Sequence, residues 1–224
     1  MPEVPRGCYT LQEGRKEKEG ERVDIVCLDL EGVLVPEIWI QVAEKTGIEG
    51  LRATTRDIPD YNVLMRRRLE LMDGNGLVLA DIQAVIDDMG PLEGAEAFLD
   101  GLREVTQVLI LSDTFYEFAR PLMRQLGWPT LFCHRLETDA AGAITGYRLR
   151  MDDHKRQTVR ALQGLNFNVA AVGDSYNDTG MLTEADAGYL FRAPVNVVSE
   201  FPQFPVLETF SDLLSALTGG VKDI

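Results

Sequence analysis

Three short apolar runs, each reaching an aspartate, constrain the fold of this chain most strongly. The runs are VDIVCLDL, TQVLILSD and NVAAVGD, and their aspartates are Asp29, Asp113 and Asp174. Each run is rich in Val, Leu or Ala and is followed by a segment with helical spacing, which is typical of a parallel sheet built from strand–helix units. Because the carboxyl ends of parallel strands open onto one crevice, we expect the three carboxylates to converge there. The sequence therefore predicts an α/β fold with a Rossmann-like parallel sheet core.

The composition indicates a globular protein and argues against two kinds of partner. Hydrophobic residues make up 45% and charged residues 26% of the 224 residues, so the chain can bury a sizeable core. The formal net charge of −14 disfavours general binding to nucleic acids or anionic membranes, because phosphate groups attract lysine and arginine. An acidic site can still bind a phosphate ester through a divalent cation. We therefore expect a small-molecule substrate, with no nucleic acid and no membrane partner; a homodimer is compatible with the sequence.

The cysteines and the apolar runs give an expectation about location. Cys8, Cys27 and Cys133 show no CxxC spacing, so they predict neither a zinc site nor a disulfide framework. Cys27, two residues before Asp29, is interpreted as a small buried hydrophobe. No apolar run approaches the roughly 18 residues that span a bilayer, and the first residues lack the apolar stretch of a signal peptide. We expect a cytoplasmic protein.

Periodicity divides the chain into an extension, a core and a cap. Residues 1–22 are rich in charged residues and glycine with little periodicity, so we expect a flexible N-terminal extension. Residues 37–91 contain three segments with helical spacing, IWIQVAEKTG, NVLMRRRLELMDG and LADIQAVIDDMG, and no convincing strand. We predict that they form a helical cap, inserted after the first strand, over a core built from residues 23–36 and 92–224.

The second half of the chain carries three further patterns. The stretch LETDAAGAITGYRLR alternates on either side of turn residues at Ala141 and Gly142, which predicts a small β-hairpin. The stretch AGYLF predicts another strand. The stretch SDLLSALTGG predicts a closing helix with Ser211 as its N-cap.

Four ordered motifs carry a resemblance to a known family. The runs DLEGVL, LILSDT, HKRQTV and VGDSYND occur in the order of the four motifs of the haloacid dehalogenase superfamily, and the resemblance extends from Val23 to about Leu217. It implies that Asp29 is a nucleophile that accepts a phosphoryl group. It also implies Mg²⁺ as the cofactor, held by Asp29, the main-chain carbonyl of Glu31, and Asp174.

Elementary chemistry supports these roles. A carboxylate can attack phosphorus when a divalent cation offsets the repulsion between two anions, and Mg²⁺ prefers oxygen ligands. Asp178 comes four residues after Asp174, so it can orient waters on the metal or the basic residue of the third motif; the alternative is a simple interaction with a helix dipole. Asn177 is expected to help bind the substrate.

The phosphoryl group needs neutral and cationic partners. Ser112 is a neutral donor at a strand end, suited to a phosphoryl oxygen. The resemblance favours Lys155 as the cation, with the adjacent Arg156 as the alternative, and a solvated helix-start lysine is the structural alternative. No histidine pair has the spacing of metal ligands, so we interpret His134 and His154 as surface residues or as neighbours of the site.

Five stretches narrow the resemblance to the phosphoserine phosphatase/homoserine phosphotransferase subgroup. They are DLEGVLVPEIW, TTRDIPDYNVLM, LSDTFYEF, MRQLG and GDSYNDT. The resemblance implies that Glu37 binds the substrate ammonium group and that Arg66 binds its carboxylate, because a planar guanidinium suits bidentate carboxylate binding. Because positions 66 to 68 are all arginine, the sequence does not decide which of the three faces the substrate. The alternative to a binding role is that they form a solvated helix face.

The sequence departs from the usual phosphatase pattern at two places. Glu31 stands where most members have an aspartate that protonates the leaving alkoxide, so the acid is retained on a side chain one methylene longer. Asp113 and Thr114 stand where phosphoserine phosphatases usually have glycines, which predicts a narrower and more polar pocket. Both changes leave the balance between hydrolysis and transfer open.

The resemblance implies an enzyme. We expect a Mg²⁺-dependent phosphoserine phosphatase or phosphoserine:homoserine phosphotransferase that acts through an aspartyl-phosphate. A general small-molecule phosphomonoesterase is the alternative, followed by a non-catalytic metabolite-binding protein on the same fold, because fold alone does not decide function. The presence of Asp29, Lys155 and Asp174 together argues against the binding protein.

Overall fold

A seven-stranded sheet forms the centre of the protein. The computed structural model describes residues 23–54, 57–58 and 60–219, so the predicted extension at residues 1–22 lies outside the described residues. Within the described part, the sheet has the order β4-β3-β2-β1-β5-β6-β7. The strands are β1 (Ile25–Leu28), β2 (Gln107–Phe115), β3 (Thr130–Thr138), β4 (Ile144–Arg148), β5 (Val169–Gly173), β6 (Ala187–Phe191) and β7 (Val206–Leu207). All neighbouring strands are parallel except β3 and β4, which confirms the predicted parallel core.

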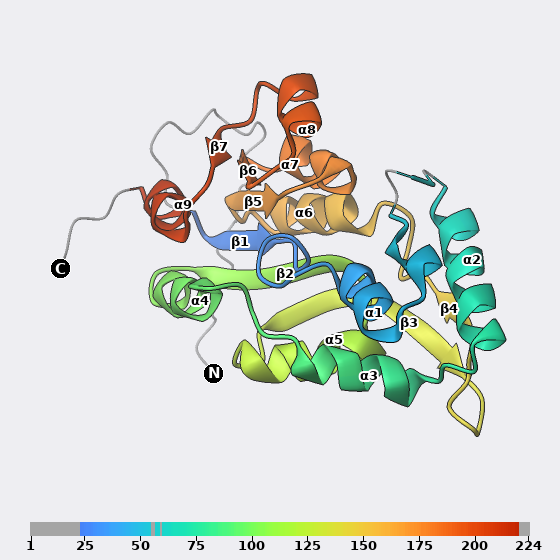
Figure 1. Ribbon diagram of the computed structural model, residues 1–224. Coiled ribbons are helices and arrows are strands. Elements are labelled where there is room, and N and C mark those ends of the chain that lie inside the picture. The colour runs from blue at the N-terminus through green and yellow to red at the C-terminus, as the bar shows by residue number, and fades with distance from the viewer. Residues whose placement is uncertain (1–22, 55–56, 59, 220–224) are drawn as a thin grey trace, which may run out of the picture.

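Helices cover both faces of this sheet, as Figure 1 shows. One face carries α4 (Ala95–Arg103), α5 (Tyr116–Gln125) and α9 (Phe210–Leu217), and the other carries α6 (His154–Gly164), α7 (Thr179–Glu184) and α8 (Val195–Glu200). Successive residues of β1 serve opposite faces, because Val26 and Leu28 join one hydrophobic cluster while Cys27 joins the other. Burial on both faces explains why this strand reads as one continuous apolar run.

The predicted cap segment consists of helices joined by short irregular stretches and contains no strand among its described residues. It contains α1 (Ile38–Thr46), the short 3₁₀ helix η1 (Glu49–Arg52), α2 (Tyr61–Gly74) and α3 (Leu79–Asp88), which confirms the three predicted helices. Helix α3 packs against α5, and α2 lies beside β4. The first turn of α2 is fixed to the core, because the Tyr61 hydroxyl donates to the carbonyl of Asp113 at 3.0 Å and the Tyr147 hydroxyl donates to Asn62 at 2.6 Å.

The predictions for the second half of the chain were confirmed in part. Strands β3 and β4 pair antiparallel around a turn at residues 139–143, so the predicted β-hairpin is confirmed. The parallel part of β3, which pairs with β2, was not predicted, and neither were β7 and α8. Ser211 is not the N-cap of α9: the helix begins one residue earlier, and the side chain of Thr209 accepts from the backbone N–H of Asp212 at 3.1 Å.

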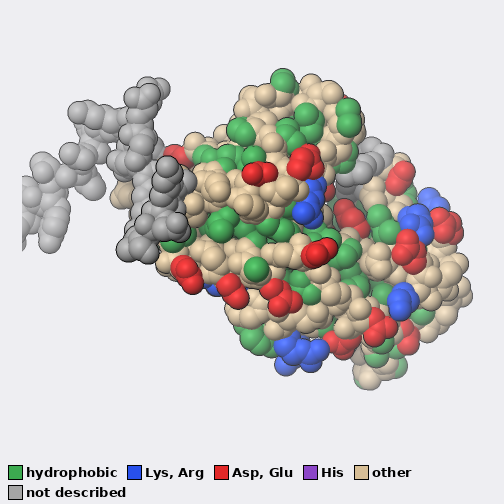
Figure 2. All heavy atoms as spheres, turned by 60° about the vertical axis from the view of Figure 1, so that its left-hand side comes forward, with side chains coloured by type: hydrophobic (Ala, Val, Ile, Leu, Met, Phe, Trp, Pro, Cys, Tyr) green, Lys and Arg blue, Asp and Glu red, His purple; other side chains and the backbone are tan. Residues whose placement is uncertain are grey.

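The surface fits the acidic composition. On the face shown in Figure 2, acidic side chains are scattered over the surface together with a few lysines and arginines. The lysines and arginines on this face do not gather into a basic patch. Among the described residues, no helix combines the length and apolar character needed to cross a membrane.

Candidate active site

Three acidic side chains surround the Lys155 ammonium group at the carboxyl end of the sheet. Its Nζ lies 2.9 Å from Asp29 Oδ1, 2.8 Å from Asp178 Oδ1 and 3.6 Å from Asp113 Oδ2. Asp29 follows β1, Asp113 lies near the end of β2, and Asp178 follows β5, so three neighbouring strands bring these acids together. The lysine enters from the first turn of α6 and is only 3% exposed.

The charges of this cluster depend on one another. Burial alone would lower the pKa of Lys155, but the carboxylates of Asp178 and Asp29 outweigh burial and raise it well above its ordinary value, so the ammonium group stays charged. Burial, followed by the carboxylate of Asp178, raises the pKa of Asp29, and the lysine opposes this. An anionic Asp29 therefore needs additional positive charge nearby, which a metal ion can supply.

Three of the acids form a group that can hold a metal ion. Carboxylate oxygens of Asp29, Asp174 and Asp178 lie within 4.8 Å of one another, and all three residues are buried. An all-oxygen donor set of this kind suits Mg²⁺. Gly32 fits closely against it: its φ is +79°, and a Cβ there would lie 2.5 Å from the Asp174 carboxylate.

Asp178 has hydrogen bonds that set it apart from a simple surface cap. Its Oδ2 accepts from the backbone N–H groups of Asp174 and Ser175, at 3.0 and 3.1 Å, and its Oδ1 accepts from Lys155. The side chain is fully buried. It therefore holds both the loop that carries Asp174 and the lysine, in the position that the sequence predicted for a supporting acid.

The structure distinguishes the two candidate cations of the third motif. Lys155 lies in the carboxylate cluster, whereas Arg156 points away and its Nε donates to Glu184 at 2.8 Å. Ser112, 1% exposed, lines the cavity, and its Oγ accepts from the backbone N–H of Thr114 at 3.2 Å. Thr114 is itself buried and is not among the residues that line the cavity.

Glu31 lies at the side of the cavity nearest the cap. Its Oε2 accepts from the backbone N–H of Ile38 at 2.9 Å, at the start of α1. Burial, with a further contribution from the charge of Glu37, raises the pKa of Glu31 to about 8. A carboxyl group with this pKa keeps its proton at neutral pH and can therefore serve as a general acid.

Of the three consecutive arginines at positions 66 to 68, Arg68 is the one that lines the cavity. Arg66 is exposed on α2 and does not line the cavity, whereas Arg68 is 6% exposed and does. Its guanidinium lies 4.4 Å from the centre of the Trp39 ring, and its Nη2 donates to the carbonyl of Ala53 at 2.9 Å. The structure therefore brings Arg68, and not the predicted Arg66, to the cavity. Glu37, half-buried, also lines the cavity.

The buried Arg68 guanidinium is charged and lacks part of its hydrogen bonding within the described part of the chain. Burial is the main influence on its pKa. It lowers the pKa of Arg68 to about 10, while the charges of Glu31 and Glu37 oppose this, so the guanidinium remains a cation at neutral pH. Among the described residues, its Nε has no hydrogen-bond partner. A buried donor without a partner is costly, so an incoming anion that accepts from this group would be stabilised.

Two histidines, interpreted from the sequence as surface residues or as neighbours of the site, lie beside Asp113. His134, on β3, and His154, at the start of α6, are each 3% exposed, and their Nε2 atoms lie 3.4 and 3.1 Å from Asp113 Oδ1. The surface alternative for them is wrong. Asn177 completes the group, since its Nδ2 donates to Asp113 Oδ2 at 2.7 Å. Cys27 is fully buried, and burial raises the pKa of its thiol to about 12, as expected of a packing residue.

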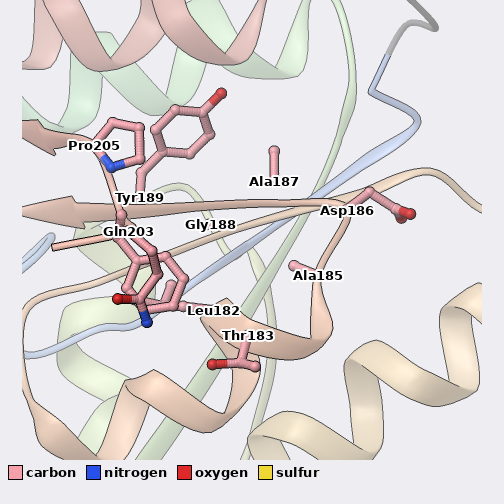
Figure 3. A pocket seen from close by; sticks show the side chains of 10 residues that line it. Leu182, Thr183, Ala185, Asp186, Ala187, Gly188, Tyr189, Gln203 and Pro205 are labelled. Atoms are coloured by element: carbon pink, nitrogen blue, oxygen red, sulfur yellow. The ribbon is translucent and has the colours of Figure 1, made fainter. Parts of the chain in front are cut away.

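One large cavity is lined by most of the candidate site residues, among them Asp29, Glu31, Ser112, Asp113, Lys155 and Asp174. Its volume is about 970 Å³, and its walls come from the sheet end, from the cap and from the loop after β4. A smaller depression of about 390 Å³ lies between α7, β6 and the segment before β7 (Figure 3). It is lined mostly by small and apolar residues with Tyr189 and Gln203, and the catalytic candidates lie in the larger cavity.

Comparison with known proteins agrees with this site. The sequence model of the haloacid dehalogenase-like hydrolases matches residues 23–186, so the chain belongs to that family. A protein of Pseudomonas syringae pv. tomato named phosphoserine phosphatase is 66% identical over 191 residues, which are 85% of this chain and 81% of that protein. A protein of Pseudomonas aeruginosa named phosphoserine phosphatase ThrH is 64% identical over 191 residues, which are 85% of this chain and 93% of that protein.

Solved structures share the fold. A substrate-bound phosphoserine phosphatase complex superposes with a TM-score of 0.72 at 19% identity, covering 88% of this chain and 99% of the other. A phospho-aspartyl intermediate analogue of phosphoserine phosphatase superposes with a TM-score of 0.70, covering 88% and 100%. At this identity the likeness confirms the α/β fold with its inserted cap and extends no further.

Proposed function

We propose that the protein is a Mg²⁺-dependent phosphoserine phosphatase that can also transfer the phosphoryl group to homoserine. The observation that carries the proposal is the buried Asp29, held by Lys155 beside Asp174, in the large cavity of a haloacid dehalogenase-like hydrolase. The names of the two relatives above 60% identity support the choice of phosphoserine among phosphate esters.

Asp29 is the nucleophile in this proposal. Its carboxylate attacks phosphorus, the bond to the serine oxygen breaks, and an aspartyl-phosphate remains on Asp29. When bound by Asp29, Asp174 and the main-chain carbonyl of Glu31, Mg²⁺ would offset the repulsion between the carboxylate and the phosphoryl group. Lys155 and Ser112 supply the charge and the hydrogen-bond donor that the phosphoryl oxygens need.

Glu31 handles the proton. With its pKa near 8 it carries a proton that can pass to the departing serine oxygen, and as a carboxylate it can then accept a proton from the next hydroxyl. That hydroxyl belongs either to water, which gives hydrolysis, or to an amino-acid alcohol, which gives transfer. The position of the longer side chain relative to phosphorus decides between them.

The cap recognises the two charges of the amino acid. Arg68 binds the carboxylate through its guanidinium, and Glu37 binds the ammonium group, since both line the cavity beside Trp39. The assignment of the carboxylate to Arg68 replaces the predicted Arg66. Asn177 and Asp113, which also line the cavity, complete the surroundings of the phosphoryl group.

One assay separates the candidate functions. Purified protein with Mg²⁺ and phosphoserine is assayed for free phosphate and for phosphohomoserine, with and without homoserine. Phosphate alone identifies a phosphatase, and phosphohomoserine at the expense of phosphate identifies a transferase. Equal turnover of unrelated phosphate esters would indicate a general phosphomonoesterase. Binding of phosphoserine without any turnover would support the metabolite-binding protein and refute the proposed function.

A further inference from the structure

Asp113 is an acid on the wall of a cavity that receives an anion. Its side chain is 33% exposed, and both oxygens are occupied on the protein side. Oδ1 faces the Nε2 atoms of His134 and His154, while Oδ2 accepts from Asn177 at 2.7 Å and lies 3.6 Å from the Lys155 ammonium. His154 and Asn177 lie at hydrogen-bond distance from this carboxylate, and His134 and the Lys155 ammonium surround it at 3.4 and 3.6 Å.

The two imidazoles and Asp113 have the composition of a transition-metal site, but hydrogen bonding excludes that role. The Nδ1 of His134 accepts from the backbone N–H of Arg150 at 3.2 Å and therefore carries no hydrogen. In neutral imidazole the hydrogen is then on Nε2, the atom that faces Asp113. A ring nitrogen that carries a hydrogen cannot ligate a metal, so His134 is a donor to Asp113.

The donors around Asp113 keep it ionised. Burial would raise its pKa, but Lys155, the two histidines and Asn177 outweigh burial and hold the pKa of Asp113 well below its ordinary range. What Asp113 presents to the cavity is a negative charge that its neighbours hold in place, 3.6 Å from the Lys155 ammonium.

We propose that Asp113 is a specificity-determining residue that weakens the binding of inorganic phosphate, the product of hydrolysis, by placing a fixed negative charge beside Lys155. The inference rests on the proposed phosphatase function. Phosphoserine gains the contacts proposed for Glu37 and Arg68 in the cap, which offset the cost of this charge, whereas inorganic phosphate gains neither contact. The charge of Asp113 therefore leaves the product with the weaker net binding.

A purely structural role for Asp113 predicts the opposite sign. If its main task were to hold Lys155 and Asn177, its neutralisation would loosen two groups that face the phosphoryl site, and phosphate would bind more weakly. Lys155 keeps two closer partners, Asp29 and Asp178, at 2.9 and 2.8 Å. The lysine therefore remains in place when Asp113 loses its charge, and the electrostatic effect dominates.

The test is the affinity of the Mg²⁺-saturated protein for inorganic phosphate, measured by titration calorimetry. We expect Asp113→Asn, which keeps the shape and removes the charge, to lower the dissociation constant by roughly three- to tenfold, as for one partly screened unit charge at the edge of a site. Asp113→Ser is the second variant, because its hydroxyl still accepts from an imidazole; it should change the affinity in the same direction. Asp100→Asn, on the exposed side of α4, removes the same net charge as a control and should leave the affinity unchanged.

Three outcomes would overturn the role proposed for Asp113. Unchanged or weaker phosphate binding in both folded Asp113 variants would overturn the proposal, and so would a failure of wild type and variants alike to bind phosphate. Tighter binding in the Asp100 variant as well would show a general effect of net charge and would also overturn it. If the wild type does not turn over phosphoserine, the proposed function fails, yet the comparison of phosphate affinities still tests the role of Asp113.

Discussion

Arg68 provides the sharpest test of how the cap reads the substrate. Replacing it by methionine removes the cation but keeps an unbranched side chain against Trp39, so the packing of α2 changes little. The lost interaction is a charge-assisted contact between a buried guanidinium and the substrate carboxylate, and such contacts contribute about 1.5 to 3 kcal/mol. We expect kcat/KM for phosphoserine to fall roughly 10- to 150-fold.

A substrate without the carboxylate isolates this interaction. Phosphoethanolamine keeps the phosphoryl and ammonium groups, so we expect the Arg68→Met variant to turn it over with kcat/KM within about threefold of wild type. Arg66→Met is the matched control, since it removes the same charge from the exposed face of the same helix and should affect neither substrate. Equal losses for both substrates, or a larger loss in the Arg66 variant, would refute the assignment of the carboxylate to Arg68.

Three further changes test the site. Asp29→Asn should abolish phosphoserine turnover, because an amide is a poor nucleophile, and beryllium fluoride bound to any other residue in a crystal of the wild type would contradict this. Burial raises the pKa of Glu31 from about 4.5 to about 8, so the folded protein holds a proton that the unfolded chain has released. Without metal, in the presence of a chelator, the free energy of unfolding of the wild type should therefore fall as the pH rises from 5 to 8, the window between those pKa values. The fall should be less steep in Glu31→Gln. If denaturant unfolding gives the same pH dependence for both proteins, Glu31 titrates normally. Gly32→Ala directs a Cβ to 2.5 Å from the Asp174 carboxylate and should weaken Mg²⁺ binding at least about tenfold by calorimetry, whereas Gly47→Ala, also at positive φ but with open space, should not.

The site residues at the strand ends could be predicted because the same sequence pattern marks the strand and the site residue that follows it. An apolar run that stops at a carboxylate identifies both the buried strand and the residue that leaves it, so Asp29 and Asp174 could be placed from the sequence. The choice between Lys155 and Arg156 could not be made in this way. It depends on the direction in which α6 leaves Asp153, whose backbone is left-handed with φ of +48°.

Arg68 could have been found from its neighbours. Leu64 and Met65 are buried and lie four and three residues before it, so Arg68 shares their face of α2, while Arg66 lies about 200° away around the helix. The two histidines had no such signal. The pairing of β3 with β2 brings His134 to Asp113, and the start of α6 brings His154 there, so no local spacing in the sequence marks them.

The crowding of acids around one lysine also links ion binding to folding. Asp29, Asp113 and Asp178 are separated and hydrated in the unfolded chain, and folding gathers them around a single ammonium group, with Asp174 beside Asp29 and Asp178. A divalent cation that binds only the folded chain shifts the folding equilibrium by mass action, by about 2.7 kcal/mol at a free concentration one hundred times its dissociation constant. The magnesium ion proposed for the chemistry is therefore also a thermodynamic ligand of the native state, and the folded population depends on its supply.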